Sequence, residues 1–194
     1  MGSLRYIYGM VMAGKTAKFI KDVKNEKSNH YIMKPDIDYE IKKEKIVSRN
    51  GTEVKANILI TKTTDLLNDI NYNGIEKLYI DEAQFLSPSH VEQLKQLTIL
   101  KDLDVLCYGL RTDFKSKLFE GATRLFEICD YISEIESKCN YCPKKATHNI
   151  KIVDGMCLAE GQTIQLSSET DVELYWPCCY KCYNELIKSK KIKC

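Results

Sequence analysis

The sequence predicts an α/β fold, in which helices cover both faces of a mostly parallel sheet. Five short apolar segments have the length and composition of buried strands: residues 4–8, 31–33, 57–60, 78–80 and 105–108. Segments with the apolar spacing of helices alternate with them, and this alternation is typical of a parallel sheet. Two further features refine the prediction: a glycine-bounded loop after the first strand, and cysteines concentrated in the last third of the chain.

Three helices are expected between these strands. Residues 16–25 place apolar side chains on one side of the first helix. A threonine at position 63 or 64 is expected to cap the second helix, which would include residues 66–70. Ser87-Pro88 begins the third helix, because proline is favoured at the first helical position.

Two polar stretches interrupt this pattern. Residues 34–56 are rich in charge and contain the turn signal Asn50-Gly51, so we expect a mobile excursion or a hairpin there. Residues 155–170 are expected to form a loop.

Composition and charge narrow the class of protein. The chain has 194 residues, which fits one domain or one domain with a small appendage. With 29 basic and 27 acidic residues, its net charge of +2 is too even for a protein whose main task is to coat nucleic acid. No apolar run approaches the ~20 residues that span a bilayer, and the run near the N-terminus is too short for a signal peptide. We therefore expect a cytoplasmic protein with no nucleic-acid or membrane partner.

The distribution of the nine cysteines predicts two domains. Cys107 and Cys129 lie in apolar stretches and are expected in a core, whereas the other seven follow residue 135. Disulfides do not persist in a reducing compartment, so clustered cysteines indicate a metal site. We expect a core domain at residues 1–135 and a metal-binding lobe at residues 136–194.

Two C-x₂-C pairs carry the metal prediction. Cys139 with Cys142, and Cys179 with Cys182, can together bind zinc with four thiolates. Four thiolates leave no open position on the ion, so the site would be structural. The residues alone leave open a C-x₃-C pairing of Cys178 with Cys182, a redox pair, or buried free thiols.

The loop after the first strand has the pattern G-x-x-x-x-G-K-[ST], formed by Gly9, Met10, Val11, Met12, Ala13, Gly14, Lys15 and Thr16. Its glycines allow the backbone to wrap a phosphate with N–H groups facing inward, and the following helix directs its positive end at the same anion. Lys15 would reach the β- and γ-phosphates, and Thr16 would ligate Mg²⁺. The strand before the loop and the helix after it are the context that the motif requires, so the sequence predicts nucleotide binding.

Two carboxylates follow the fourth predicted strand. Asp81 comes directly after Leu78-Tyr79-Ile80, and the carboxyl ends of parallel strands line the ligand crevice. Asp81 would therefore lie close to Mg²⁺, and Glu82 could act as a general base on the attacking nucleophile. The pair also fits a helix N-cap, and it leaves ATPase and kinase chemistry both open.

Four blocks, which run in the family's order over nearly the whole chain, show that the sequence resembles the zinc-containing type II thymidine kinases. They are the phosphate loop at residues 9–16, Asp81-Glu82-Ala83-Gln84-Phe85-Leu86, residues 107–114 continuing to Leu118-Phe119, and residues 175–183. The last block is similar to the family's Y-x-P-x-C-R-x-C-Y and assigns Cys179, rather than Cys178, to the metal. The first block is common to many nucleotide-binding proteins, but the set of four is specific.

The resemblance implies a phosphate-loop, RecA-like sheet and a small zinc-ribbon lobe with a lasso loop that covers the nucleoside. It also implies transfer of the γ-phosphate of ATP to the 5′-hydroxyl of thymidine or deoxyuridine in nucleotide salvage. Glu82 matches the proposed base, and Asp38 and Gln84 join Asp81 among the ATP- and Mg²⁺-binding residues. The nucleoside-binding residues that it implies are Leu110, Phe114, Leu118, Phe119, Ile164, Leu166, Ser167, Ser168 and Tyr175.

A homodimer or homotetramer, and inhibition by the end-product thymidine triphosphate (dTTP), are further implications of the resemblance. Three departures from the family pattern accompany it. Glu40 stands where arginine is usual, Leu166-Ser167-Ser168 replaces I-G-G, and Tyr180 replaces the arginine between the second pair of cysteines. Glu40 and the altered segment at residues 166–168 leave open a family member that binds nucleotides without catalysis. The Asp81-Glu82 pair and the lysines among residues 188–193 leave open a zinc-ribbon ATPase that acts on nucleic acid.

Overall fold

A computed structural model describes residues 1–37, 44–160 and 173–189. The chain forms two compact units. The first unit comprises Met1–Tyr8, Gly14–Leu110 and Phe119–Glu134, and the second comprises Gly9–Ala13, Arg111–Leu118 and Ile135–Cys194. Two short segments before residue 135 thus belong to the second unit, and the domain division at that residue stays a prediction.

The first unit contains, within the described ranges, a six-stranded sheet in the order β5-β2-β6-β7-β1-β8. Strand β2 runs parallel to both β5 and β6, and β6 runs parallel to β7, as expected of a mostly parallel sheet. The strands are β1 (Leu4–Gly9), β2 (His30–Pro35), β5 (Ile58–Ile60), β6 (Lys77–Ile80), β7 (Asp104–Leu110) and β8 (Tyr131–Ile135). All five predicted strands are therefore present.

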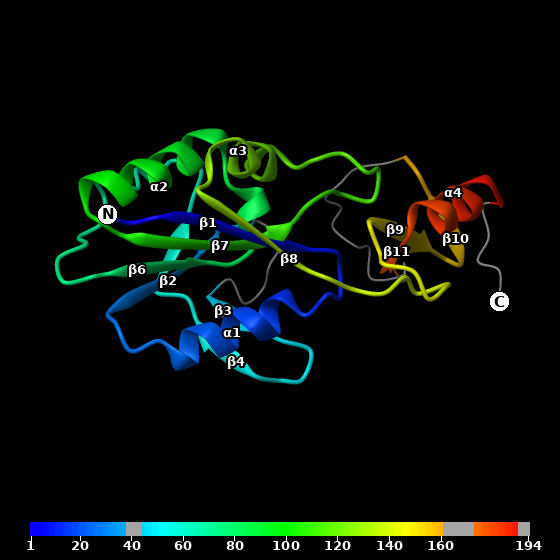
Figure 1. Cartoon of the computed structure of the whole chain (residues 1–194), viewed down its shortest axis with the longest axis horizontal. Helices are drawn as coiled ribbons and strands as arrows, with labels where there is room; N and C mark the ends of the chain where they lie inside the picture. Colours follow the sequence, from blue (N-terminus) through cyan, green and yellow to red (C-terminus); the bar gives the residue numbers. More distant parts are fainter. Residues whose placement is uncertain (38–43, 161–172, 190–194) are drawn as a thin grey trace. The chain divides into compact units, whose positions relative to one another are not determined.

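Helices cover both faces of this sheet, as predicted (Figure 1). Helices α2 (Pro88–Leu100) and α3 (Glu120–Ile128) lie on one face, and α1 (Lys15–Asn25) lies on the other. Ser87 is the N-cap of α2, because its hydroxyl accepts a hydrogen bond from the His90 N–H at 3.1 Å. Phe19 of α1 packs edge-on against Tyr108 of β7, with ring centroids 5.1 Å apart.

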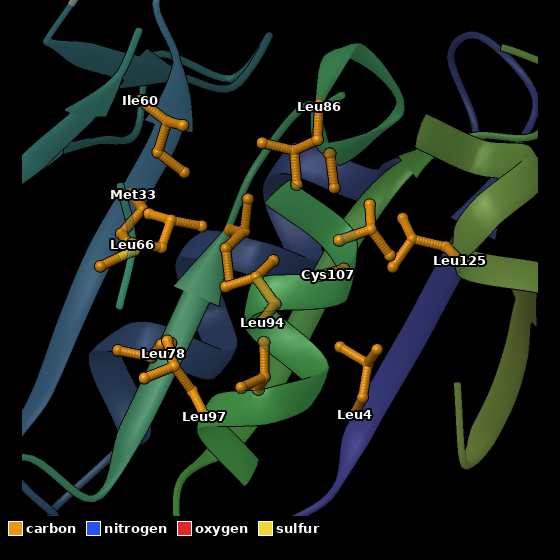
Figure 2. Close-up of a cluster of buried hydrophobic side chains, with 14 of the residues drawn as sticks. Leu4, Met33, Ile60, Leu66, Leu78, Leu86, Leu94, Leu97, Cys107 and Leu125 are labelled. Atoms are coloured by element: carbon orange, nitrogen blue, oxygen red, sulfur yellow. The ribbon is translucent and has the colours of Figure 1, made fainter. Parts of the chain in front are cut away.

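The main hydrophobic core lies between α2, α3 and the sheet. Figure 2 shows Leu94 and Leu97 of α2 beside Leu78 of β6, and all three side chains are fully buried. Burial of each such leucine stabilises the fold by roughly 1.5–3 kcal/mol. Cys107 belongs to this core, and the half-buried Cys129 packs against it, as expected.

The helix expected at residues 66–70 is absent, and that prediction is wrong. Turns and bends occupy the segment instead. The Asp65 carboxylate accepts the Leu67 N–H at 3.0 Å, and the Asp69 carboxylate accepts the Asp65 N–H at 2.7 Å. Side-chain oxygens that take nearby N–H groups in this way compete with helical hydrogen bonds. Leu66 is nevertheless fully buried in the core.

The polar stretch 34–56 contains the hairpin that the sequence allowed. Strands β3 (Lys45–Val47) and β4 (Glu53–Lys55) pair antiparallel around the Asn50-Gly51 turn. The Lys45 ammonium donates to the Glu53 carboxylate across the pair at 2.8 Å.

The second unit contains the three-stranded antiparallel sheet β10-β9-β11 and helix α4 (Tyr180–Ser189). Its strands are β9 (His148–Val153), β10 (Met156–Leu158) and β11 (Glu173–Cys178). The loop expected at residues 155–170 is thus corrected for residues 156–158, which pair with β9. Ile150 and Ile152 of β9 form the core of the unit together with buried cysteines.

None of the helices in the described ranges is both long and apolar enough to cross a membrane.

Candidate functional site

The phosphate loop connects β1 to α1 as the motif requires. Met12 and Gly14 both have left-handed backbones, with φ of 61° and 86°, and such alternation turns successive N–H groups toward one anion. Gly9 is closely packed, since a Cβ atom there would lie 2.9 Å from the Ile135 carbonyl oxygen. The Lys18 N–H makes the first helical bond to the Gly14 carbonyl, so the N–H groups of residues 15–17 precede the helical ladder. The loop therefore has the backbone of an anion site.

Lys15 lies among charged groups of the first unit. Burial lowers the pKa of its ammonium, while the neighbouring carboxylates of Glu82 and Asp81 raise it. Thr16 follows in the first turn of α1, where its side chain is half-buried. The lysine and the carboxylate pair predicted from separate motifs thus come together in the structure.

Asp81 and Glu82 follow the carboxyl end of β6. Asp81 is 5% exposed, and burial, followed by the adjacent Glu82, raises the pKa of its carboxyl well above the ordinary value. The positive charges of Lys15 and Lys34 oppose this shift. Glu82 has a φ of 52°, a left-handed conformation that is strained for a residue with a side chain. Strain of this kind is concentrated at functional sites.

Gln84 fixes the Glu82 side chain. It lies in the short 3₁₀ helix η1 (Ala83–Phe85) and is 1% exposed. Its Nε2 donates to Glu82 Oε2 at 2.5 Å, and its Oε1 accepts the Leu110 N–H at 2.9 Å. The sequence pattern placed Gln84 with the ATP- and Mg²⁺-binding residues, whereas the amide here contacts the expected base.

Two of the expected nucleoside residues, Phe114 and Tyr175, lie near one another in the second unit. Phe114 is 2% exposed, and its ring centroid lies 6.5 Å from that of Tyr175 on β11. The Tyr183 hydroxyl donates to the Phe114 carbonyl oxygen at 2.8 Å and so holds the backbone of that segment. Leu118, in the same unit, is largely exposed.

Two expected nucleoside residues lie in the first unit. Leu110 ends β7, and Phe119 packs edge-on against Phe85 with ring centroids 5.3 Å apart. Phe119 also contacts the hydrophobic core. Asp38, Ile164, Leu166, Ser167 and Ser168, together with Glu40, lie outside the described residues.

Two buried polar residues of β9 were missed by the sequence analysis. Lys151 is 1% exposed, and its Nζ lies 5.6 Å and 5.7 Å from the ring centroids of Phe114 and Tyr175. Asn149 is also 1% exposed. The signal that could have found them is their position in Asn149-Ile150-Lys151-Ile152, where polar residues alternate with isoleucines that enter a core.

Four thiols form a candidate metal centre. The Sγ atoms of Cys139, Cys142, Cys179 and Cys182 all lie within 4.8 Å of one another. Those of Cys142 and Cys179 are 3.6 Å apart, close to the ~3.8 Å expected for two thiolates on one tetrahedral zinc ion. Cys178 and Cys157 are buried in the surrounding core and are not in the group, so the structure places Cys179, rather than Cys178, with the other three thiols. The four residues fit a structural zinc ion.

A parallel sheet with a strand–loop–helix anion site, and a carboxylate pair beside the loop lysine, define a phosphate-loop nucleotide-binding protein. Comparison with known proteins narrows the class. The thymidine kinase family profile matches residues 2–183. The chain is 36% identical to the thymidine kinase of Enterobacteria phage T4, with 97% of this chain and 98% of the relative covered. It is 32% identical to that of Enterococcus faecalis (94% and 95% covered) and 31% identical to that of Encephalitozoon cuniculi (95% and 88%). The chain belongs to the thymidine kinase family.

Proposed function

We propose that the chain transfers the γ-phosphate of ATP to the 5′-hydroxyl of thymidine, or of deoxyuridine, to give the monophosphate and ADP in nucleotide salvage. The proposal depends on one observation: Gln84 holds the Glu82 carboxylate by a hydrogen bond, in the neighbourhood of Asp81 and Lys15. The chain that carries this arrangement belongs to the thymidine kinase family. A fixed carboxylate near a phosphate-binding lysine is suited to deprotonating an alcohol that attacks a phosphate.

The phosphate loop and Lys15 bind the β- and γ-phosphates in this proposal, through backbone N–H groups and the ammonium. Thr16, Asp81 and Asp38 would hold Mg²⁺, which supplies charge neutralisation between the phosphates when it is bound. The burial of Asp81 supports this role, because a carboxylate that is costly to charge alone gains from a neighbouring cation.

Glu82 accepts the proton of the 5′-hydroxyl as the new oxygen–phosphorus bond forms and the bond to ADP breaks. General base catalysis of this kind contributes typically 10²–10⁴-fold. The bond from Gln84 keeps the carboxylate in one orientation, so little reorganisation is needed during the reaction.

Base recognition is proposed for the second unit. Phe114 would stack on thymine, with Tyr175 beside it, since a planar base needs an aromatic face and a few fixed hydrogen bonds. By resemblance to the family, the loop between the two cysteine pairs would cover the nucleoside and exclude water, which competes with the hydroxyl for the phosphate. Structural zinc, a homodimer or homotetramer, and inhibition by dTTP are proposed on family membership and the four-thiol cluster.

The test combines product analysis with a conservative variant. The pure protein is incubated with Mg·ATP and each natural deoxynucleoside, and monophosphate formation is measured. We expect product from thymidine and little from deoxycytidine or the purines. Glu82→Gln should lower turnover by at least about 100-fold while ATP still binds.

The exposed Glu76 offers a matched control, because Glu76→Gln removes a carboxylate from the same unit. Near-normal turnover in Glu82→Gln would remove Glu82 from the role of base. ATP binding without any nucleoside product would favour the non-catalytic alternative. ATP hydrolysis that is stimulated by nucleic acid would favour the nucleic-acid ATPase.

A further inference from the structure

Asn149 joins three segments that are distant in the sequence. Its Oδ1 accepts the Val11 N–H of the phosphate loop at 2.9 Å, and its Nδ2 donates to the Thr112 carbonyl oxygen at 2.9 Å. Val11, Thr112 and Asn149 belong to the three separate stretches of chain that form the second unit. Few buried side chains could replace this one, because the position requires an acceptor and a donor at once.

The chemistry of the two partners determines the orientation of the amide. A backbone N–H can only donate and a carbonyl oxygen can only accept, so exchanging the oxygen and nitrogen of Asn149 would break both bonds. The side chain is 1% exposed, so water cannot readily replace either partner. Opposite Asn149 on β11 is Pro177, which has no N–H that could compete for the amide oxygen.

Each bond reaches a substrate-binding segment. Val11 is the third residue of the phosphate loop, and its N–H is engaged by Asn149, which holds the first half of the loop in place. Thr112 lies two residues before Phe114, in a segment that folds back so that Thr112 pairs with Leu118. The Asn149 amide therefore makes one bond to each segment.

We propose that Asn149 is a positioning residue that holds the first half of the phosphate loop and the Phe114 segment in fixed positions. The binding of ATP and of the nucleoside then both depend on one buried amide. The proposal rests on the proposed function for the role of Phe114. It predicts that breaking the bond to Thr112 alone weakens nucleoside binding more than ATP binding, because each of the two bonds supports the binding of a different substrate.

Two substitutions separate them. Asn149→Asp keeps an acceptor for the Val11 N–H, and at a pH where the new carboxyl is ionised it turns a negatively charged oxygen toward the Thr112 carbonyl, so the contact on the nucleoside side becomes repulsive. Asn149→Leu has similar volume and removes both bonds. Loss of a buried bond that leaves its partner unsatisfied corresponds to a change of roughly 5- to 100-fold.

Steady-state kinetics with thymidine and Mg·ATP provide the readout, together with zinc content and melting temperature. For Asn149→Asp we expect the KM for thymidine to rise by roughly 5- to 100-fold and the KM for ATP to change much less. For Asn149→Leu both KM values should rise. The control is Asn184→Asp in α4, because the Asn184 amide also donates to a backbone carbonyl, that of Tyr180 at 3.0 Å. This control should keep both KM values.

Wild-type KM values in Asn149→Asp, or a loss of activity that only follows the fraction of folded protein, would overturn the proposal. Equal rises of both KM values in Asn149→Asp would overturn it as well, because the two bonds would then not act on separate substrates. If Asn149→Leu does not fold, the Asp variant decides alone. Failure of the proposed function is distinct, since the wild-type chain would then form no thymidine monophosphate.

Discussion

Replacing Gln84 tests whether the orientation of Glu82 matters for phosphate transfer. Gln84→Glu keeps an oxygen that accepts the Leu110 N–H but substitutes an oxygen for the Nε2 that donates to Glu82 at 2.5 Å. Two carboxyl groups would then lie in contact, and the negative charge on one raises the pKa of the other. One carboxyl would keep its proton at neutral pH, and Glu82 could no longer accept the proton of the substrate reliably.

The expected magnitude follows from the contacts. If the base contributes 10²–10⁴-fold, Gln84→Glu should lower kcat by about 10-fold or more, with little change in the KM for ATP. Raising the pH should recover part of the activity, because the shared proton is then lost. Gln84→Leu also leaves the Leu110 N–H without its acceptor, which costs about 1–3 kcal/mol of unfolding free energy. For a chain of this size that lowers Tm by about 2–4 °C per kcal/mol.

Initial rates of monophosphate formation between about pH 6 and pH 9, with saturating substrates, provide the assay for the Gln84 variants. Gln93 on α2 provides a matched control, since its Oε1 also accepts a backbone N–H, that of Leu66, at 2.9 Å. Gln93→Glu and Gln93→Leu should affect Tm without a specific effect on kcat. A wild-type kcat for Gln84→Glu across the pH range would refute the reasoning, because the contact with Glu82 would then have no consequence for catalysis.

Two further predictions concern stability. Cys179→Ser should reduce bound zinc from about one ion per chain to a small fraction and destabilise the second unit, whereas Cys178→Ser should keep the metal; metal analysis of protein purified without chelator distinguishes them. Hydrogen bonds from Lys77, at 2.6 Å, and from Ser28 and Tyr79 lower the pKa of the Glu26 carboxyl far below its ordinary 4.5. The ionised Glu26 carboxylate therefore stabilises the folded state fully above pH 4.5, and this stabilisation is lost as the pH falls through the lowered pKa. Glu26→Gln should reduce the unfolding free energy by about 1–3 kcal/mol at pH 7 and by less below pH 4.5, as urea titrations would show; an equal deficit at both pH values would contradict the linkage.

Features that depend on local pattern were predictable from the sequence. The five strands, the phosphate loop and the carboxylate pair each have a signature within a few residues, and the sheet topology then brings Lys15 close to Asp81. The C-x₂-C pairs likewise predicted the four-thiol cluster. The expected helix at residues 66–70 failed because hydrogen bonds from Asp65 and Asp69 competed with the apolar spacing.

The missed features depend on contacts between distant residues. Asn149 reaches Val11 across 138 residues, and the role of Gln84 depends on the backbone of Leu110. The alternation around Asn149 indicates a buried polar side chain, but neither contact can be predicted from a local pattern because its partners are far apart in the chain. The second unit was also hard to predict in detail, because its strands are short and its cysteines enter both the core and the metal cluster.

The position of β1 in the sheet has a consequence for protein synthesis. This strand lies between β7 and β8, and the Ser3 carbonyl accepts the Val105 N–H at 2.8 Å. A ribosome that adds 5–20 residues per second delivers that partner on the order of 5–20 s after β1 has been made. Until then the N-terminal strand has neither of its neighbours, and the phosphate loop that follows it has no rigid support. The nascent chain thus acquires its nucleotide site only after β7 has been synthesised, although the motif is translated well before that strand.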